Sequence, residues 1–100
     1  GFWKFEKIDG KLKFSRLGLV SDFIQWDNSL IDRLWINLER NKLTSIYFLP
    51  KMFEYDNWKN LKVLTLKFSS NNLSNLNGLS TAISYLKNLE ELVINLDKNN

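Results

Sequence analysis

The sequence predicts an α/β fold in which a strand, a turn and a helix recur along the chain. Three stretches carry nearly the same phrase, which reads LWINLERNKL from Leu34, LTLKFSSNNL from Leu64 and LVINLDKNN from Leu92. Their alternating apolar residues predict short, half-buried strands. The residues after the second stretch carry apolar side chains at helical spacing. Equivalent residues at a fixed spacing indicate a repeat architecture.

The equivalent positions stay in register across the copies. At a spacing of 30, the first copy (Leu34, Ile36, Leu38, Asn41, Leu43) precedes the second (Leu64, Leu66, Phe68, Asn71, Leu73). At a spacing of 28, the third copy contributes Leu92, Ile94, Leu96 and Asn99. A weaker copy precedes the first by 31 residues, with Trp3, Phe5 and Leu12 at the places of Leu34, Ile36 and Leu43. Residues 1–29 are therefore a degenerate first repeat or cap, and residues 30–100 hold the clear repeats.

The strand after Leu61 and the helix that follows it are the best defined. Leu64–Phe68 alternates with period two, and the SSNN that follows supplies turn residues. Beyond it, Leu79, Ala82, Ile83 and Leu86 share one helical face, with Ser80 either capping the helix or lying in its first turn. The segment IYFLPKMFEYDNW contains Pro50 and five aromatics, which predicts an irregular return or a short, broken helix.

These residues resemble the leucine-rich repeat, whose strand carries spaced leucines followed by Asn and another Leu. The unit length is similar to the ribonuclease-inhibitor-like subclass, and the three apolar residues before the Asn are similar to repeats of ciliate and other protist proteins. The resemblance implies a curved solenoid with parallel strands on the concave face and helices or irregular returns on the convex face. It also implies a structural ladder of asparagines, formed here by Asn41, Asn71 and Asn99.

The outward positions of the strands form the predicted partner-binding surface. One row runs through Lys4, Trp35, Thr65 and Val93, and the next through Glu6, Asn37, Lys67 and Asn95. We expect Trp35, Asn37, Thr65, Lys67, Val93 and Asn95 to contact a protein partner, because repeat proteins expose a broad binding surface of this kind. Trp35 is either an interface anchor or a side chain that its own chain covers.

A basic N-terminal segment supports an alternative function. The first 16 residues carry five basic side chains against two acidic ones, whereas the remaining 84 residues carry nine of each. The basic residues are Lys4, Lys7, Lys11, Lys13 and Arg16, and they alternate with aromatic residues. Such a mixture can bind single-stranded nucleic acid. The same residues also fit a repeat strand with core aromatics.

The composition disfavours catalysis and cofactor binding. The chain has no cysteine and no histidine, so thiolate sites and the commonest general base are missing. There is no glycine-rich phosphate loop and no nucleophile elbow. We expect a non-enzymatic protein without cofactor, metal, membrane or small-molecule ligand. Glu90 and Glu91 are expected on a solvated rim, and Trp26 and Trp58 in the core. The missing signal peptide and cysteines favour an intracellular, cytoplasmic location.

The third copy ends soon after its asparagine. A strand in that place leaves the apolar residues beneath Leu92, Ile94 and Leu96 open, and repeat arrays need capping units at their ends. We therefore expect one domain or fragment over residues 1–100 that is completed by flanking repeats or by another subunit.

Overall fold

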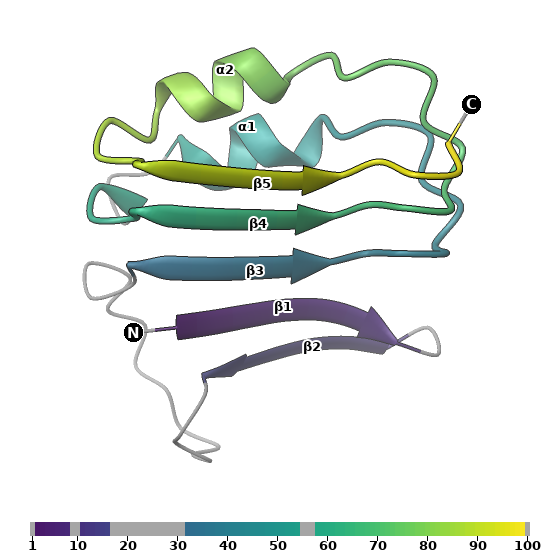
Figure 1. Cartoon of the computed structure of the whole chain (residues 1–100), viewed down its shortest axis with the longest axis horizontal. Coiled ribbons are helices and arrows are strands. Elements are labelled where there is room, and N and C mark those ends of the chain that lie inside the picture. The colour runs from purple at the N-terminus through teal and green to yellow at the C-terminus, as the bar shows by residue number, and fades with distance from the viewer. Residues whose placement is uncertain (1, 9–10, 17–31, 55–57, 100) are drawn as a thin grey trace.

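The computed structural model describes residues 32–54 and 58–99 in full, and the backbone of residues 2–8 and 11–16. In order, its elements are β1 (Phe2–Ile8), β2 (Lys11–Arg16), β3 (Arg33–Asn37), α1 (Phe48–Phe53), β4 (Val63–Lys67), α2 (Leu79–Ser84) and β5 (Glu91–Asn95) (Figure 1). The chain therefore forms a small α/β domain, as predicted.

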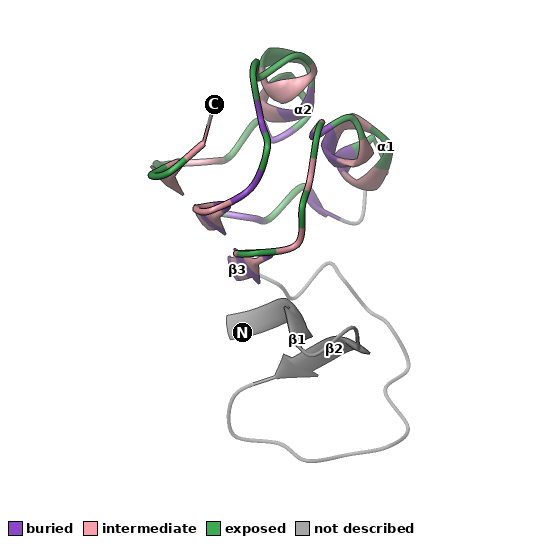
Figure 2. Cartoon of the chain, turned by 90° about the vertical axis from the view of Figure 1, so that its right-hand side faces the viewer, coloured by how far each residue is buried: buried purple, intermediate pink, exposed green. Residues whose placement is uncertain are grey.

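All the described strands belong to one sheet, in the order β2-β1-β3-β4-β5. Strands β1, β3, β4 and β5 are parallel, and β2 is antiparallel to β1. Parallel neighbours need a crossover connection, and α1 and α2 lie in the two crossovers from β3 to β5. Both helices lie on the same side of the sheet, and no described helix or strand covers the other side of β3–β5 (Figure 2).

The predicted spacings are the register of the parallel strands. Leu34 pairs with Leu64, and Leu64 pairs with Leu92, which reproduces the spacings of 30 and 28. Backbone hydrogen bonds continue this register past the strand ends. The amide of Leu38 donates to the carbonyl of Lys67 at 2.9 Å, and one unit later the amide of Phe68 donates to the carbonyl of Asn95 at 2.9 Å. The copies are therefore structurally equivalent as well as similar in sequence.

The core lies between the sheet and the two helices. The alternate residues Leu34, Ile36, Leu64 and Leu66 are buried from the strands, and Leu49, Phe53 and Ala82 are buried from the helices. Burying an aliphatic side chain of this size contributes roughly 1.5–3 kcal/mol. On β3 and β4, the period-two alternation thus predicted correctly which side chains enter the core.

The return after β3 is a short helix, as the sequence predicted. α1 has six residues, and Pro50 is its third. A proline is tolerated there because the first N–H groups of a helix have no acceptor within it. Phe53 contacts Trp58 edge to face, with ring centroids 5.4 Å apart. The prediction that Trp58 is a core residue is confirmed, whereas Trp26 lies outside the described residues.

α2 is a second six-residue helix, and it begins after a glycine in the left-handed region. Gly78 has φ of +97°, and its backbone closely approaches α1: a Cβ at this position would lie 3.2 Å from Cγ of Pro50. Ser80 lies exposed in the first turn and does not cap the helix. Leu86 is buried just after the helix ends, so the predicted apolar face reaches the core although the helix is shorter than its pattern suggested.

The N-terminal copy departs from the prediction in one respect. β1 pairs in parallel with β3, and its register of 31 places Trp3 opposite Leu34 and Phe5 opposite Ile36, as expected. Leu12, however, does not take the place equivalent to Leu43. It lies in β2 opposite Lys7, because the chain turns back after β1 and forms an antiparallel hairpin. The equivalence of Leu12 with Leu43 was therefore wrong.

Replacing Gly78 with alanine tests the contact between the helices. We expect Gly78→Ala to lower the free energy of unfolding by about 1–2 kcal/mol, because a residue with a Cβ is strained at positive φ and its Cβ would press on Pro50. Urea denaturation measures the change. Ser80→Ala, an exposed position two residues later, is the matched control and should change stability by less than about 0.5 kcal/mol. Equal effects of the two substitutions would contradict this account.

Candidate interaction surface

The side of the sheet opposite the helices carries the residues predicted to contact a partner. We call Trp35, Asn37, Thr65, Lys67, Val93 and Asn95 the open strand face. Strand register brings them together: Trp35 pairs with Thr65 and Thr65 with Val93, while Asn37 pairs with Lys67 and Lys67 with Asn95. The β1 backbone extends both rows, with Lys4 opposite Trp35 and Glu6 opposite Asn37. The two rows therefore exist as predicted.

The exposure of the open strand face follows the alternation of each strand. On β3 and β4 the outward side chains are half-buried between fully buried neighbours. Val93, on β5, is more open, with 45% of its surface exposed. Trp35 is half-buried and interacts with other residues of the chain. Its role as an interface anchor stays a prediction.

A small cluster of Lys67, Trp35 and Glu39 crosses from β4 to β3. The Nζ atom of Lys67 lies 5.5 Å from the centroid of the Trp35 ring. It also lies 3.9 Å from Oε1 of Glu39. Lysine over an indole ring is a favourable cation–π arrangement, whereas a partly exposed ion pair at this distance contributes little. The ammonium group of Lys67 on β4 thus contacts both the Trp35 ring on β3 and the carboxylate of Glu39, which follows β3.

Glu39 is the member of this cluster that sequence reasoning missed. It follows the end of β3 and lies two residues beyond Asn37. The signal was present, because Glu39 is the next outward position after Trp35 and Asn37 in the same alternation. Glu39 already belongs to the turn after β3, where the strand prediction ended.

Asn37 and Asn95 have a structural role besides their predicted partner role. The Oδ1 atom of Asn37 accepts a hydrogen bond from the amide of Glu39 at 3.1 Å, and the Oδ1 atom of Asn95 accepts one from the amide of Asp97 at 3.1 Å. Each side chain thus closes the turn after its strand, which is a common use of asparagine. A partner on this face would therefore meet two asparagines whose carbonyl oxygens are already engaged.

The basic N-terminal positions are divided by the strand pairing. In the β1–β2 hairpin, Lys4 is opposite Ser15 and Lys13 is opposite Glu6, while Lys7 is opposite Leu12. Lys11 pairs with Ile8, and Arg16 pairs with Trp3. Because alternate residues of a strand belong to opposite faces, Lys4, Lys11 and Lys13 occupy one set of positions, and Lys7 and Arg16 the other. The backbone register thus does not collect all five on one face.

The predicted ladder residue Asn71 joins two units by hydrogen bonds. Its Oδ1 atom accepts from the amides of Asn41 at 2.9 Å and Leu43 at 3.0 Å, both in the preceding unit. Its Nδ2 atom donates to the carbonyls of Leu38 and Phe68, each at 2.9 Å. Asn71 is 4% exposed and is the one buried polar residue in the described part of the chain. All four hydrogen-bonding positions of its amide are therefore used.

Asn99 repeats these bonds one unit later. Its Oδ1 atom accepts from the amide of Leu73 at 3.1 Å, and its Nδ2 atom donates to the carbonyls of Phe68 and Leu96, each at 2.9 Å. The described bond of the Asn41 side chain stays within its own turn, from Nδ2 to the carbonyl of Glu39 at 2.9 Å. The side chains of Asn71 and Asn99 thus connect adjacent units, while Asn41 donates its backbone N–H to the Oδ1 atom of Asn71.

The residue before each of these asparagines is left-handed, which the sequence did not reveal. Arg40, Ser70 and Lys98 have φ of 57°, 58° and 59°. Non-glycine residues adopt this conformation rarely and at a cost of about 1–2 kcal/mol. Three different residue types share it at equivalent positions, so the backbone of the turn dictates the conformation and the side chain does not.

The predicted rim residues Glu90 and Glu91 are both exposed. Across the described residues, no group of three potential metal ligands gathers in one place. No helix in that part of the chain is long and apolar enough to cross a membrane.

Comparisons with known proteins leave the family open. No family model, no curated protein and no solved structure matches this chain.

Replacing Asn71 with alanine tests the ladder. We expect a loss of about 3 kcal/mol in the free energy of unfolding, because each backbone group left buried without a partner costs about 1–3 kcal/mol. Asn71→Asp should also destabilise, since a carboxylate cannot donate to the carbonyls of Leu38 and Phe68. Asn75, which only closes an exposed turn through the amide of Asn77, is the matched control. A loss on Asn75→Ala as large as that on Asn71→Ala would refute the ladder's role.

A double-mutant cycle tests the contact between Lys67 and Trp35. We expect Lys67→Met and Trp35→Leu to be coupled by about 0.5 kcal/mol in chemical denaturation, the value for an exposed cation–π pair. The same cycle between Lys67 and Tyr85, an exposed residue at the end of α2, should give no coupling. Additive effects of the Lys67 and Trp35 substitutions would show that the ring and the ammonium group do not interact.

Proposed function

We propose that this chain is a leucine-rich-repeat solenoid module that binds a protein partner on the open strand face and has no catalytic role. The observation that carries the proposal is a half-buried tryptophan at the centre of parallel strands that no described element covers on that side (Figure 2). Aromatic residues in such positions anchor protein interfaces.

Three further observations support the assignment to this repeat class. The spacings of 30 and 28 coincide with the strand register. The amides of Asn71 and Asn99 bond to backbone groups of the unit before them. The helices lie on one side of the sheet, so the strand rows on the other side form a continuous surface. Repeat proteins of this design use such surfaces as scaffolds for macromolecules.

The chemistry of the open strand face indicates what a partner must offer. The ammonium group of Lys67 lies over the Trp35 ring and also approaches the carboxylate of Glu39, while Thr65 and Val93 continue the row of Trp35 with small side chains. A partner that covers this face would place an apolar or aromatic side chain on Trp35 and Val93. Its polar groups would pair with Lys67 or Glu39 around that contact.

Capture from an extract of the native cells tests the proposal. Immobilised chain should retain a set of proteins that Trp35→Ala loses, with a signal at least about tenfold weaker, as expected for an interface anchor. The melting temperature of Trp35→Ala should change little, because the ring is not a fully buried core residue. Lys51→Ala, an exposed position on α1 on the helical side, is the matched control and should retain the same proteins.

The same experiment separates the nucleic-acid alternative. A nuclease-treated extract should give the same retained proteins, and their binding should tolerate moderate salt. Retention that disappears with nuclease, or that falls steeply as salt rises, would replace the proposed function with nucleic-acid binding through the basic segment. A set of proteins indifferent to Trp35→Ala would exclude the open strand face as the binding surface.

A further inference from the structure

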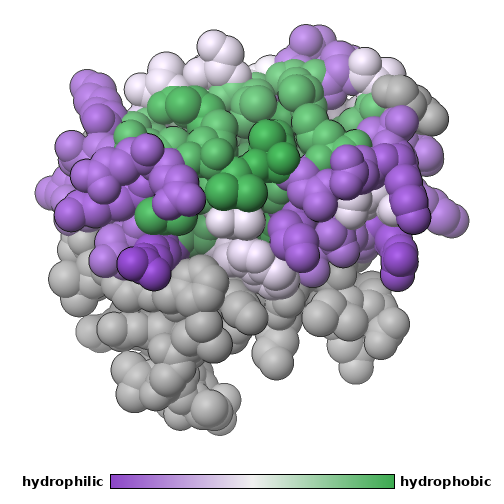
Figure 3. Space-filling model, in the orientation of Figure 1, coloured by the Kyte–Doolittle hydropathy of each residue, from purple (hydrophilic) through white to green (hydrophobic). Residues whose placement is uncertain are grey.

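The described chain has an apolar surface at β5 that is separate from the open strand face. The core-side residues of successive strands are equivalent, yet Leu34 is 1% exposed, Leu64 is 0% exposed and Leu92 is 39% exposed. We call Leu76, Leu79, Ile83, Leu92, Ile94 and Leu96 the β5 end surface. Figure 3 shows hydrophobic residues gathered over α2 and β5, with polar residues on both flanks. A contiguous apolar area of this kind is typical of an interaction site.

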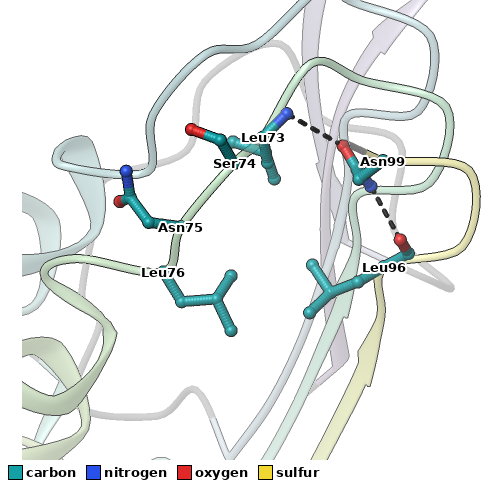
Figure 4. Close-up of a pocket in the computed structure, with 6 residues that line it drawn as sticks. All are labelled: Leu73, Ser74, Asn75, Leu76, Leu96 and Asn99. Carbon is teal, nitrogen blue, oxygen red and sulfur yellow. Dashed lines mark hydrogen bonds between the residues drawn. The ribbon is translucent and has the colours of Figure 1, made fainter.

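An open pocket of about 220 Å³ lies within this region. It is lined by the segment Leu73–Leu76 and by Leu96 and Asn99 (Figure 4). The equivalent residues one unit earlier are Leu43–Ile46, Phe68 and Asn71. There the same space is filled: Ile46 and Phe68 are 0% exposed, whereas Leu76 is 38% exposed. The pocket is therefore a vacant copy of a position that is occupied inside the molecule.

The residues that fill the inner copy belong to the next unit. The amide of Asn72 donates to the carbonyl of Leu43 at 2.9 Å, so the segment that follows β4 lies beside the segment that follows β3. Leu73, which comes directly after, is only 3% exposed. The occupant of the pocket at Leu73–Leu76 is thus expected to be an extended segment with an apolar side chain in the place of Leu73.

The hydrogen bonds of the turn indicate a second feature of the occupant. The carbonyl oxygen of Phe68 accepts from the side-chain amide of Asn71, in its own unit, and from that of Asn99, in the next unit. The equivalent carbonyl of Leu96 accepts from Asn99, and no second donor reaches it among the described residues. A carbonyl has room for two donors. The second position on Leu96 therefore matches the side-chain amide of another asparagine.

The outer edge of β5 offers the matching backbone groups. The amide of Glu91 donates to Lys62, and the carbonyl of Asn95 accepts from Phe68, so the odd-numbered residues of β5 bond to β4. In a parallel ladder the alternate residues bond to the opposite neighbour. Leu92, Ile94 and Leu96 thus present their amides and carbonyls on the outer edge, where the sheet order has no further strand among the described residues.

We propose that the β5 end surface binds one further unit of the pattern of residues 73–99. Its extended segment would lie over Leu73–Leu76, its helix beside α2, and its strand parallel to β5 with an asparagine donating to the carbonyl of Leu96. The observations that carry this proposal are independent of the open strand face. An antiparallel second copy could also pair with the edge of β5, but it would supply neither the asparagine nor the extended segment that the pocket fits.

The experiment attaches such a unit to the full chain. A copy of residues 73–99 placed directly after Asn100 keeps the spacing of 28, because its first leucine then follows Asn99 by two residues, as Leu73 follows Asn71. We expect the amides of Leu92 and Ile94 to exchange with solvent at least about tenfold more slowly in the extended chain. The urea midpoint should rise as well, since each unit of a repeat array stabilises its neighbour.

Two control variants of the extended chain isolate the proposed contacts. Alanine at the copy of Asn99 removes the new ladder bond and should reverse most of the protection of Leu92 and Ile94. Leu76→Asp should also reverse it, because a carboxylate in the pocket would be buried without a partner. Val93→Asp places the same charge on the other side of β5 and should leave the protection in place.

Two outcomes would overturn the proposal. One is an extended chain in which Leu92 and Ile94 exchange as fast as in residues 1–100 without the added unit. The other is that residues 1–100 alone are dimeric by light scattering, with Leu92 and Ile94 protected and released by Leu76→Asp; a second copy would then be the occupant. Neither outcome tests the open strand face, because the retention of partner proteins through Trp35 does not require the β5 end surface.

Discussion

The amide side chain of Asn71 is the interaction on which the described structure depends. β3, β4 and β5 are each followed by a turn, and some backbone groups of these turns bond to asparagine side chains. Asn71 satisfies four of them at once, two amides of the preceding unit and two carbonyls, while it is buried itself. A buried amide with every position used holds the turns in one register. That register in turn aligns the leucines of the core and the rows of the open strand face.

The open strand face is aligned by the same strand register, but its residues lie on the side of the sheet away from the core. The core-side residues and the ladder bury their side chains or bond to backbone groups of neighbouring units, whereas the outward residues of β3 and β4 are half-buried. The ammonium group of Lys67 lies over the half-buried ring of Trp35. Asn37 and Asn95, in the second row, each accept a hydrogen bond from the turn after their own strand.

Burial along the sheet shows that each strand relies on its neighbour. β4 lies between two parallel strands and has fully buried core-side leucines, whereas the equivalent residues of β5 are half-buried or exposed. The difference does not come from composition, since the three strands carry similar residues. It follows the position of the strands, because among the described residues β4 has a parallel strand on each side and β5 has one on a single side.

The sequence by itself determined the repeating unit, the strand register and the side of each strand that enters the core. These follow from local periodicity: apolar alternation selects a face, and a fixed spacing of Leu and Asn selects the register. It also indicated the two rows that contain Trp35 and Lys67. The tertiary structure alone decided the rest. The left-handed turns at Arg40, Ser70 and Lys98, the contact of Glu39 with Lys67, and the return of β2 along β1 depend on groups far apart in the chain or on backbone closure. Residue periodicity indicates the face on which Glu39 lies, but it carries no information about the partner of Glu39, the conformation of the turns or the direction of β2.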